Sequence, residues 1–191
     1  MTSGSVSRAA RRARPAPCLA WFLALFLALF VAGASVPTGA AEPGMATFRD
    51  ATNGFALSYP EDWRPVSFKD GPEFLVMGGG GKGPEVCNVN VVAVSGPAYL
   101  DRVTRDSMLA GLRAAMADAN FLEWRRQTLA QRWGLYYVVS GATRNQRYRQ
   151  TTLGMQVVVG AKLYTASCSA PARMFDERRA LFEKIVGSLS F

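Results

Sequence analysis

From residue 47 onward, apolar and polar positions alternate in short runs bounded by turn residues, which is typical of β-strands. The pair Asn53-Gly54 separates the runs 47–50 and 55–59 and predicts a tight hairpin, because this pair readily adopts positive φ angles. The other strands expected from the same alternation are 64–68, 73–77, 86–94, 122–129, 133–143, 147–159 and 163–169. Short separators between the last four predict an antiparallel meander.

Two segments change to a helical period. In segment 98–119 apolar or small side chains recur every three or four residues and define one helical face: Leu100, Thr104, Met108, Leu112, Ala115 and Ala119. Segment 172–186 places Phe175, Phe182 and Ile185 on one side. The fold class predicted is therefore α+β, an antiparallel β-sheet meander with two amphipathic helices packed on it.

The first 41 residues have the order of a secretory signal: arginines, an apolar run over 18–34, and small residues over 35–41. We expect a signal peptide at 1–41 for the general secretory route, a short linker at 42–46, and one domain at 47–191 in the periplasm or outside the cell. The alternative is an uncleaved anchor, because the run approaches the roughly 20 residues that span a bilayer. Membrane association is expected only in that case.

Charge and composition narrow the classes of function. The formal net charge is +8, but four arginines belong to the leader, which leaves 18 basic against 14 acidic side chains. This excess is mild and scattered, so we expect no nucleic-acid partner. The chain contains no histidine, which excludes histidine-assisted nucleophiles and histidine zinc sites. The partners expected are an unknown envelope protein or an anionic ligand.

The segment 54–63, GFALSYPEDW, resembles the opening of PsbP-like domains, a family that includes the bacterial DcrB group. The Asn-Val-rich run 87–92 is similar to the central strand of this family, and 162–191 is similar to its closing strand, helix and SLSF ending. The resemblance covers nearly all of the expected domain and consists of residues that hold a fold together.

This resemblance implies an antiparallel sheet with helices packed on it, and it carries over no catalytic residue and no cofactor. The plant members are lumenal accessory subunits of photosystem II, a Ran-binding nuclear protein shares the fold, and many bacterial members are exported. By analogy we expect an exported, periplasmic, non-catalytic binding or accessory protein of the cell envelope, with an unknown ligand and no cofactor.

Two motifs are candidate sites of chemistry. Glu61 and Asp62 offer paired carboxylates, so the alternative function is a carboxylate-dependent hydrolase or another enzyme using them. Adjacent side chains seldom converge on one atom, and a turn beside a packed Trp63 is the competing interpretation. The glycine-rich segment 78–83 lacks the spacing of a Walker phosphate-binding loop. That motif has Gly five positions before its Gly-Lys pair and Ser or Thr after the Lys, where this chain has Val76 and Gly83. We therefore interpret the segment as a hairpin connection.

Cys87 and Cys168 are the only cysteines outside the leader, and an oxidising compartment makes them a candidate disulfide. The alternative is two plain core residues. The candidate binding patch is a hairpin tip carrying Arg144, Arg147 and Arg149, called the basic tip below. Three guanidiniums close together suit carboxylates or phosphates. The competing interpretation is a solvated turn whose arginines protect strand edges.

Overall fold

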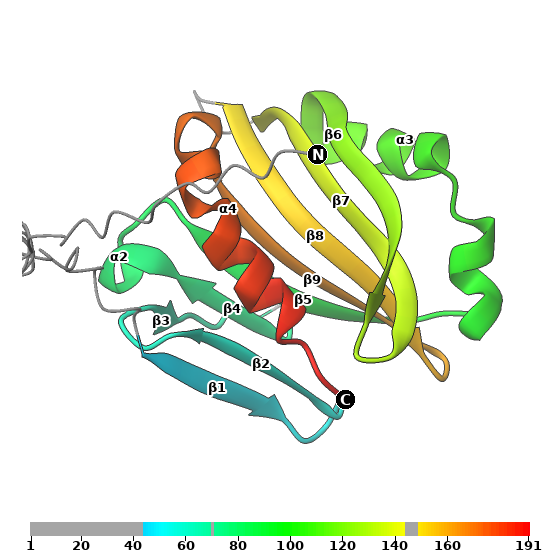
Figure 1. Ribbon diagram of the computed structural model, residues 1–191, viewed down its shortest axis with the longest axis horizontal. Helices are drawn as coiled ribbons and strands as arrows, with labels where there is room; N and C mark the ends of the chain where they lie inside the picture. The colour runs from blue at the N-terminus through cyan, green and yellow to red at the C-terminus, as the bar shows by residue number, and fades with distance from the viewer. Residues whose placement is uncertain (1–43, 70, 144–148) are drawn as a thin grey trace, which may run out of the picture. The chain divides into compact units, whose positions relative to one another are not determined.

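The computed structural model describes residues 44–69, 71–143 and 149–191 (Figure 1). The strands in these residues are β1 (Met45–Asp50), β2 (Phe55–Pro60), β3 (Arg64–Pro65), β4 (Phe74–Met77), β5 (Val86–Ala93), β6 (Met116–Leu129), β7 (Arg132–Thr143), β8 (Arg149–Val159) and β9 (Lys162–Pro171). The helices are α2 (Gly78–Gly81), the 3-10 helix η1 (Pro97–Arg102), α3 (Arg105–Ala115) and α4 (Ala172–Gly187).

The main sheet has seven strands in the order β3-β4-β5-β9-β8-β7-β6, and every neighbouring pair is antiparallel. The predicted meander over the last four strands is confirmed, because β6, β7, β8 and β9 follow one another in both sequence and space. Strand β5 pairs with β9 rather than with β6. The chain therefore passes from the middle of the sheet to its far edge through η1 and α3.

Alternation along β7 assigns the two faces of the sheet. Tyr136 and Val138 belong to the large core cluster under α4, whereas Leu135 belongs to a cluster with Leu100 of η1, and Tyr137 to one with Leu109 of α3. Because successive strand residues point to opposite faces, α4 covers one face and η1 with α3 covers the other. Figure 1 shows α4 lying across the strands of its face.

Helix α4 matches its prediction within one residue. Its apolar side holds Phe175, Phe182 and Ile185, all buried against the sheet as expected. Directly after α4, Ser190 pairs with Ala56 of β2, so the separate β1-β2 hairpin is tied to the end of the chain. This hairpin and α4 thus close the same large core.

The single helix predicted over 98–119 was wrong. Thr104 is extended (φ −96°, ψ 159°) and forms a capping box with Ser107, which starts α3 afresh after η1. Met116 is extended again (φ −123°, ψ 111°) and begins β6. The apolar positions follow a helical period through the break, although Leu100 and Leu109 serve two separate clusters. Periodicity alone does not reveal such a break.

The turn at Asn53-Gly54 is longer than a two-residue hairpin turn. The hairpin at Asn53-Gly54 is confirmed, but its register joins Asp50 to Phe55, so four residues form the turn and Gly54 has the positive φ (72°). The Asp50 carboxylate accepts hydrogen bonds from the Asn53 side chain and from the backbone N–H groups of Thr52 and Asn53, which lower its pKa.

The glycine-rich segment connects β4 to β5, as expected, through the short helix α2. Two of its glycines lie against the buried side chain of Glu85: a Cβ on Gly78 would lie 3.1 Å from Glu85 Oε2, and one on Gly83 would lie 2.7 Å from it. Arg178 of α4 pairs with the other oxygen, at 3.1 Å from Nε to Oε1. The glycines therefore make room for a structural ion pair that fastens α4 to the β4-β5 connection.

Candidate functional site

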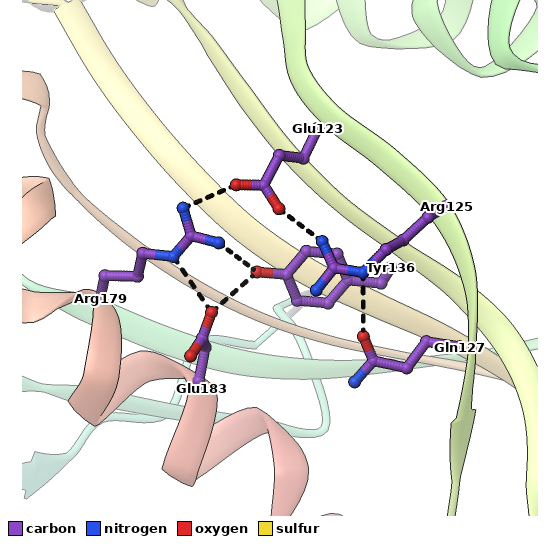
Figure 2. A network of polar contacts seen from close by, with 6 residues as sticks. All are labelled: Glu123, Arg125, Gln127, Tyr136, Arg179 and Glu183. Carbon is purple, nitrogen blue, oxygen red and sulfur yellow. Dashed lines mark hydrogen bonds and ion pairs between the residues drawn. The ribbon is translucent and has the colours of Figure 1, made fainter.

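A groove of about 160 Å³ opens between α4 and strands β6 to β8. The residues that line it are Arg125, Gln127, Tyr136, Leu153, Met155, Glu183, Val186 and Gly187. Figure 2 shows the polar residues on its two sides, with Arg125 and Gln127 on β6 and Glu183 on α4. We call this the α4 groove, and it is the candidate functional site of the described residues.

The floor of the groove comes from the α4 face of the sheet. Tyr136, Leu153 and Met155 point to this face because of their positions along β7 and β8, and all three are buried. The Tyr136 hydroxyl donates a hydrogen bond to Glu183 Oε1 at 3.1 Å. Burial, together with the negative charge of Glu183, raises the pKa of Tyr136, so its hydroxyl keeps its proton at neutral pH.

A bulge in β6 decides which of its side chains reach the groove. Phe121 pairs with Val139, whose side chain faces α3, whereas Glu123 pairs with Val138, whose side chain faces α4. The shift leaves Leu122 unpaired and 60% exposed. Beyond the bulge, Glu123 and every second residue after it lie on the α4 side, so the register shift builds this wall of the groove.

Arg125 forms the β6 wall and is held on three sides. Its guanidinium carbon lies 3.7 Å from the centre of the Tyr136 ring, a cation–π contact. Nη1 bonds Glu123 Oε2 at 2.5 Å, and Nε donates to Gln127 Oε1 at 3.3 Å. The side chain is still 46% exposed. Arg125 is thus oriented within the groove while it remains open to a ligand.

Arg179 joins the helix side of the network to the sheet side. Its Nη1 lies 2.6 Å from Glu123 Oε1, and its Nε lies 3.1 Å from Glu183 Oε1. Its Nη2 donates to the Tyr136 hydroxyl at 3.4 Å. These partners raise the pKa of Arg179, and the hydrogen bond from Arg179 lowers the pKa of Glu123. Arg179 and Glu123 are therefore both ionised at neutral pH.

Two residues of the basic tip, Arg144 and Arg147, lie outside the described residues. Arg149 begins β8, is exposed, and forms an ion pair with Asp118 of β6. The Ala142 N–H and Arg149 hold the pKa of Asp118 below its usual range. The shape of the basic tip and its role as a binding patch remain predictions.

The other sequence candidates lie apart from the groove. Glu61 and Asp62 are exposed in the turn between β2 and β3, while Trp63 is buried, with 6% exposure. Cys87 and Cys168 are direct partners across β5 and β9, with Cα atoms 4.0 Å apart and sulfur atoms at the disulfide distance of 1.99 Å. Both are fully buried under α4.

Sequence reasoning missed most of the groove. None of Tyr136, Arg179 and Glu183 is among the candidate site residues predicted from the sequence. The spacing of Arg179 and Glu183, four residues apart on a helix, was a readable signal of a paired face. Nothing in the sequence indicated that this pair would meet β6.

A metal-binding cluster and a membrane-spanning helix are both absent from the described residues. These residues contain no group of three or more His, Cys, Asp or Glu side chains able to hold a metal ion. None of the helices in the described part of the chain has both the length and the apolar composition of a membrane span.

Comparison with known proteins identifies the fold. No family profile and no curated protein sequence matches the chain. Among solved structures, the cyanobacterial PsbP (CyanoP) of Synechocystis superposes with a TM-score of 0.62 at 14% identity, covering 80% of this chain and 95% of that one. The domain therefore has the PsbP-like fold, and the expected antiparallel α+β architecture is confirmed.

Two further structures share this fold. The Ran-binding protein Mog1p of Saccharomyces cerevisiae has a TM-score of 0.55 at 7% identity, covering 78% of this chain and 96% of its own. LpqN of Mycobacterium tuberculosis, described as involved in cell envelope biogenesis, has a TM-score of 0.54 at 10% identity, covering 77% and 90%. Such low identities establish similarity of fold alone.

Proposed function

We propose that this protein is an exported, non-catalytic binding or accessory protein of the cell envelope, and that it binds its ligand in the α4 groove. The observation behind this proposal is the α4 groove itself. Hydrogen bonds and ion pairs around Tyr136 hold the polar side chains of its walls in place before any ligand binds (Figure 2). Binding sites of this kind combine an apolar floor with a few fixed polar groups. Less ordering is then required when the ligand binds.

Three points support location in the envelope. The buried pair Cys87 and Cys168 is at disulfide distance, and disulfides persist in oxidising compartments such as the periplasm. The leader expected at 1–41 provides the export route. The fold is also that of LpqN, a protein described as involved in cell envelope biogenesis.

The alternative of a carboxylate-dependent enzyme receives less support. Glu61 and Asp62 are exposed and do not line the α4 groove. A general acid needs a raised pKa, whereas the described carboxyl groups with a displaced pKa, Asp50, Asp118 and Glu123, are all displaced downward. These three groups are therefore ionised and suited to holding charge partners.

The test begins with the native protein. Fractionation of the source cells should place it in the envelope, and a low-molecular-weight envelope extract should raise its melting temperature. A ligand at 100 times its Kd adds about 2.7 kcal/mol. For a domain of this size that corresponds to a rise of roughly 5–10 °C.

Adjacent arginines on opposite faces of β6 supply a matched control. Arg125 lines the groove, whereas the guanidinium of Arg126 lies over the Trp133 ring, at 4.7 Å from its centre. Arg125→Gln should abolish the stabilisation by the extract, and Arg126→Gln should retain it. Recovery of the protein from the cytoplasm, or equal stabilisation of both variants, would refute the proposal.

A further inference from the structure

We propose that the ligand of the α4 groove is a small zwitterion with an apolar body, of the size and kind of an apolar α-amino acid. This inference deepens the proposed function and rests on the groove being a binding site. The walls of the groove carry opposite charges, its floor is apolar, and its volume is small. Each of these features restricts the ligand in a different way.

The positive pole is Arg125. Its Nη1 and Nε have partners on β6, whereas Nη2 donates to no polar group among the described residues. Arg125 is nearly half exposed where it lines the groove. An oriented guanidinium with an available N–H group is the donor that a carboxylate prefers.

The negative pole stands on the opposite wall. Glu183 Oε1 accepts hydrogen bonds from Tyr136 and Arg179, and Oε2 accepts none in the described part of the chain. Val186 and Gly187, which end α4, line the same side of the groove. The C-terminal end of a helix attracts a cation, so this side favours an ammonium group.

The network around the groove has no net charge. Arg125 and Arg179 balance Glu123 and Glu183, and the ion pairs between them join both walls (Figure 2). A ligand with net charge would leave one charge uncompensated in a partly buried site, which is costly. A zwitterion presents one group to each pole and leaves the balance unchanged.

The floor and the volume set the body of the ligand. Leu153, Met155 and Val186 form an apolar floor, and each is almost fully buried beneath the polar side chains. The volume of about 160 Å³ is close to that of an engineered protein cavity of about 150 Å³ that holds benzene. Drug-sized ligands need roughly 300 Å³ or more. A branched aliphatic side chain is the body that fits.

The experiment uses the native protein and four probes of one shape: leucine, leucinamide without the carboxylate, 4-methylpentanoate without the ammonium, and 3-methylbutylamine. Isothermal titration calorimetry should give leucine at least tenfold tighter binding than any of the other three. Amide resonances of Gln127 and Gly187 should shift with leucine, whereas that of Arg149, outside the groove, should not. Arg125→Gln should weaken leucine binding at least tenfold, and Arg126→Gln should leave it unchanged.

The inference is overturned if leucine does not bind, if the truncated probes bind equally well, or if the resonance shifts lie outside the groove. The wild-type panel decides this even if Arg125→Gln does not fold. Failure here is distinct from failure of the proposed function. An exported protein that the envelope extract stabilises through Arg125 but that ignores all four probes overturns only the inference, and a cytoplasmic protein that selects leucine overturns only the envelope function.

Discussion

Removal of the bond between Cys87 and Cys168 should cost this domain much of its stability. The two residues are 81 apart in sequence, and a bridge closing a loop of that length restricts the unfolded chain by about 4.5 kcal/mol at 25 °C. For a domain of this size such a loss lowers the melting temperature by roughly 9–18 °C. Because both side chains are fully buried, reductant should act on the folded protein only slowly.

Alanine substitutions distinguish the stability contributed by the disulfide from that contributed by packing of the two cysteine side chains. Cys87→Ala, Cys168→Ala and the double variant are compared by urea denaturation of the envelope-purified protein. Each single change removes the whole bridge, so each should cost about 4–5 kcal/mol. The second substitution removes only one more buried sulfur and should add about 1 kcal/mol or less.

Two outcomes would refute this reasoning. Single losses near 1 kcal/mol that add in the double variant would describe two independent core residues. Alkylation of both Cys87 and Cys168 in unfolded, unreduced protein would show that no bridge had formed. Cys18, if the leader is retained, would contribute a third thiol, so the alkylated positions are identified by peptide mass.

Three further predictions concern the groove network, the basic tip and the leader. The pKa of Glu123 is lowered from its ordinary value of 4.5 by the hydrogen bond from Arg179, so its stabilisation is present above that value and is lost as pH falls through the lower, folded value. Unfolding free energy measured from pH 6 to pH 2 should therefore fall less steeply for Glu123→Gln, and an unchanged slope would contradict the assignment. Replacing the three arginines of the basic tip with Ser should weaken any binding to anionic liposomes in low salt with little change in melting temperature, whereas equal, salt-insensitive binding by both proteins would reduce the tip to a solvated turn. Intact-mass measurement of the native protein should give an N-terminus near Glu42, and a membrane-bound chain retaining Arg11 would identify an anchor instead.

The sequence by itself determined the elements whose signals are local. The apolar stripe containing Phe175 and Phe182 placed α4 within one residue, and the short separators after β6 placed the meander. In these cases side-chain period and turn chemistry act within a few residues, so no distant contact is needed to interpret them. The cysteine count also predicted the pairing of Cys87 with Cys168, which lie at disulfide distance.

Tertiary structure decided what depends on distant partners. The extended Thr104 breaks a run whose apolar period continues, because its two halves pack on separate clusters. The bulge at Leu122 is a property of pairing with β7, and the strand beyond it places Arg125 on the α4 side. The α4 groove joins residues of β6, β7 and α4 that lie tens of positions apart. Their meeting follows from strand register and helix docking, which are set by the packing of the whole core and not by any local pattern.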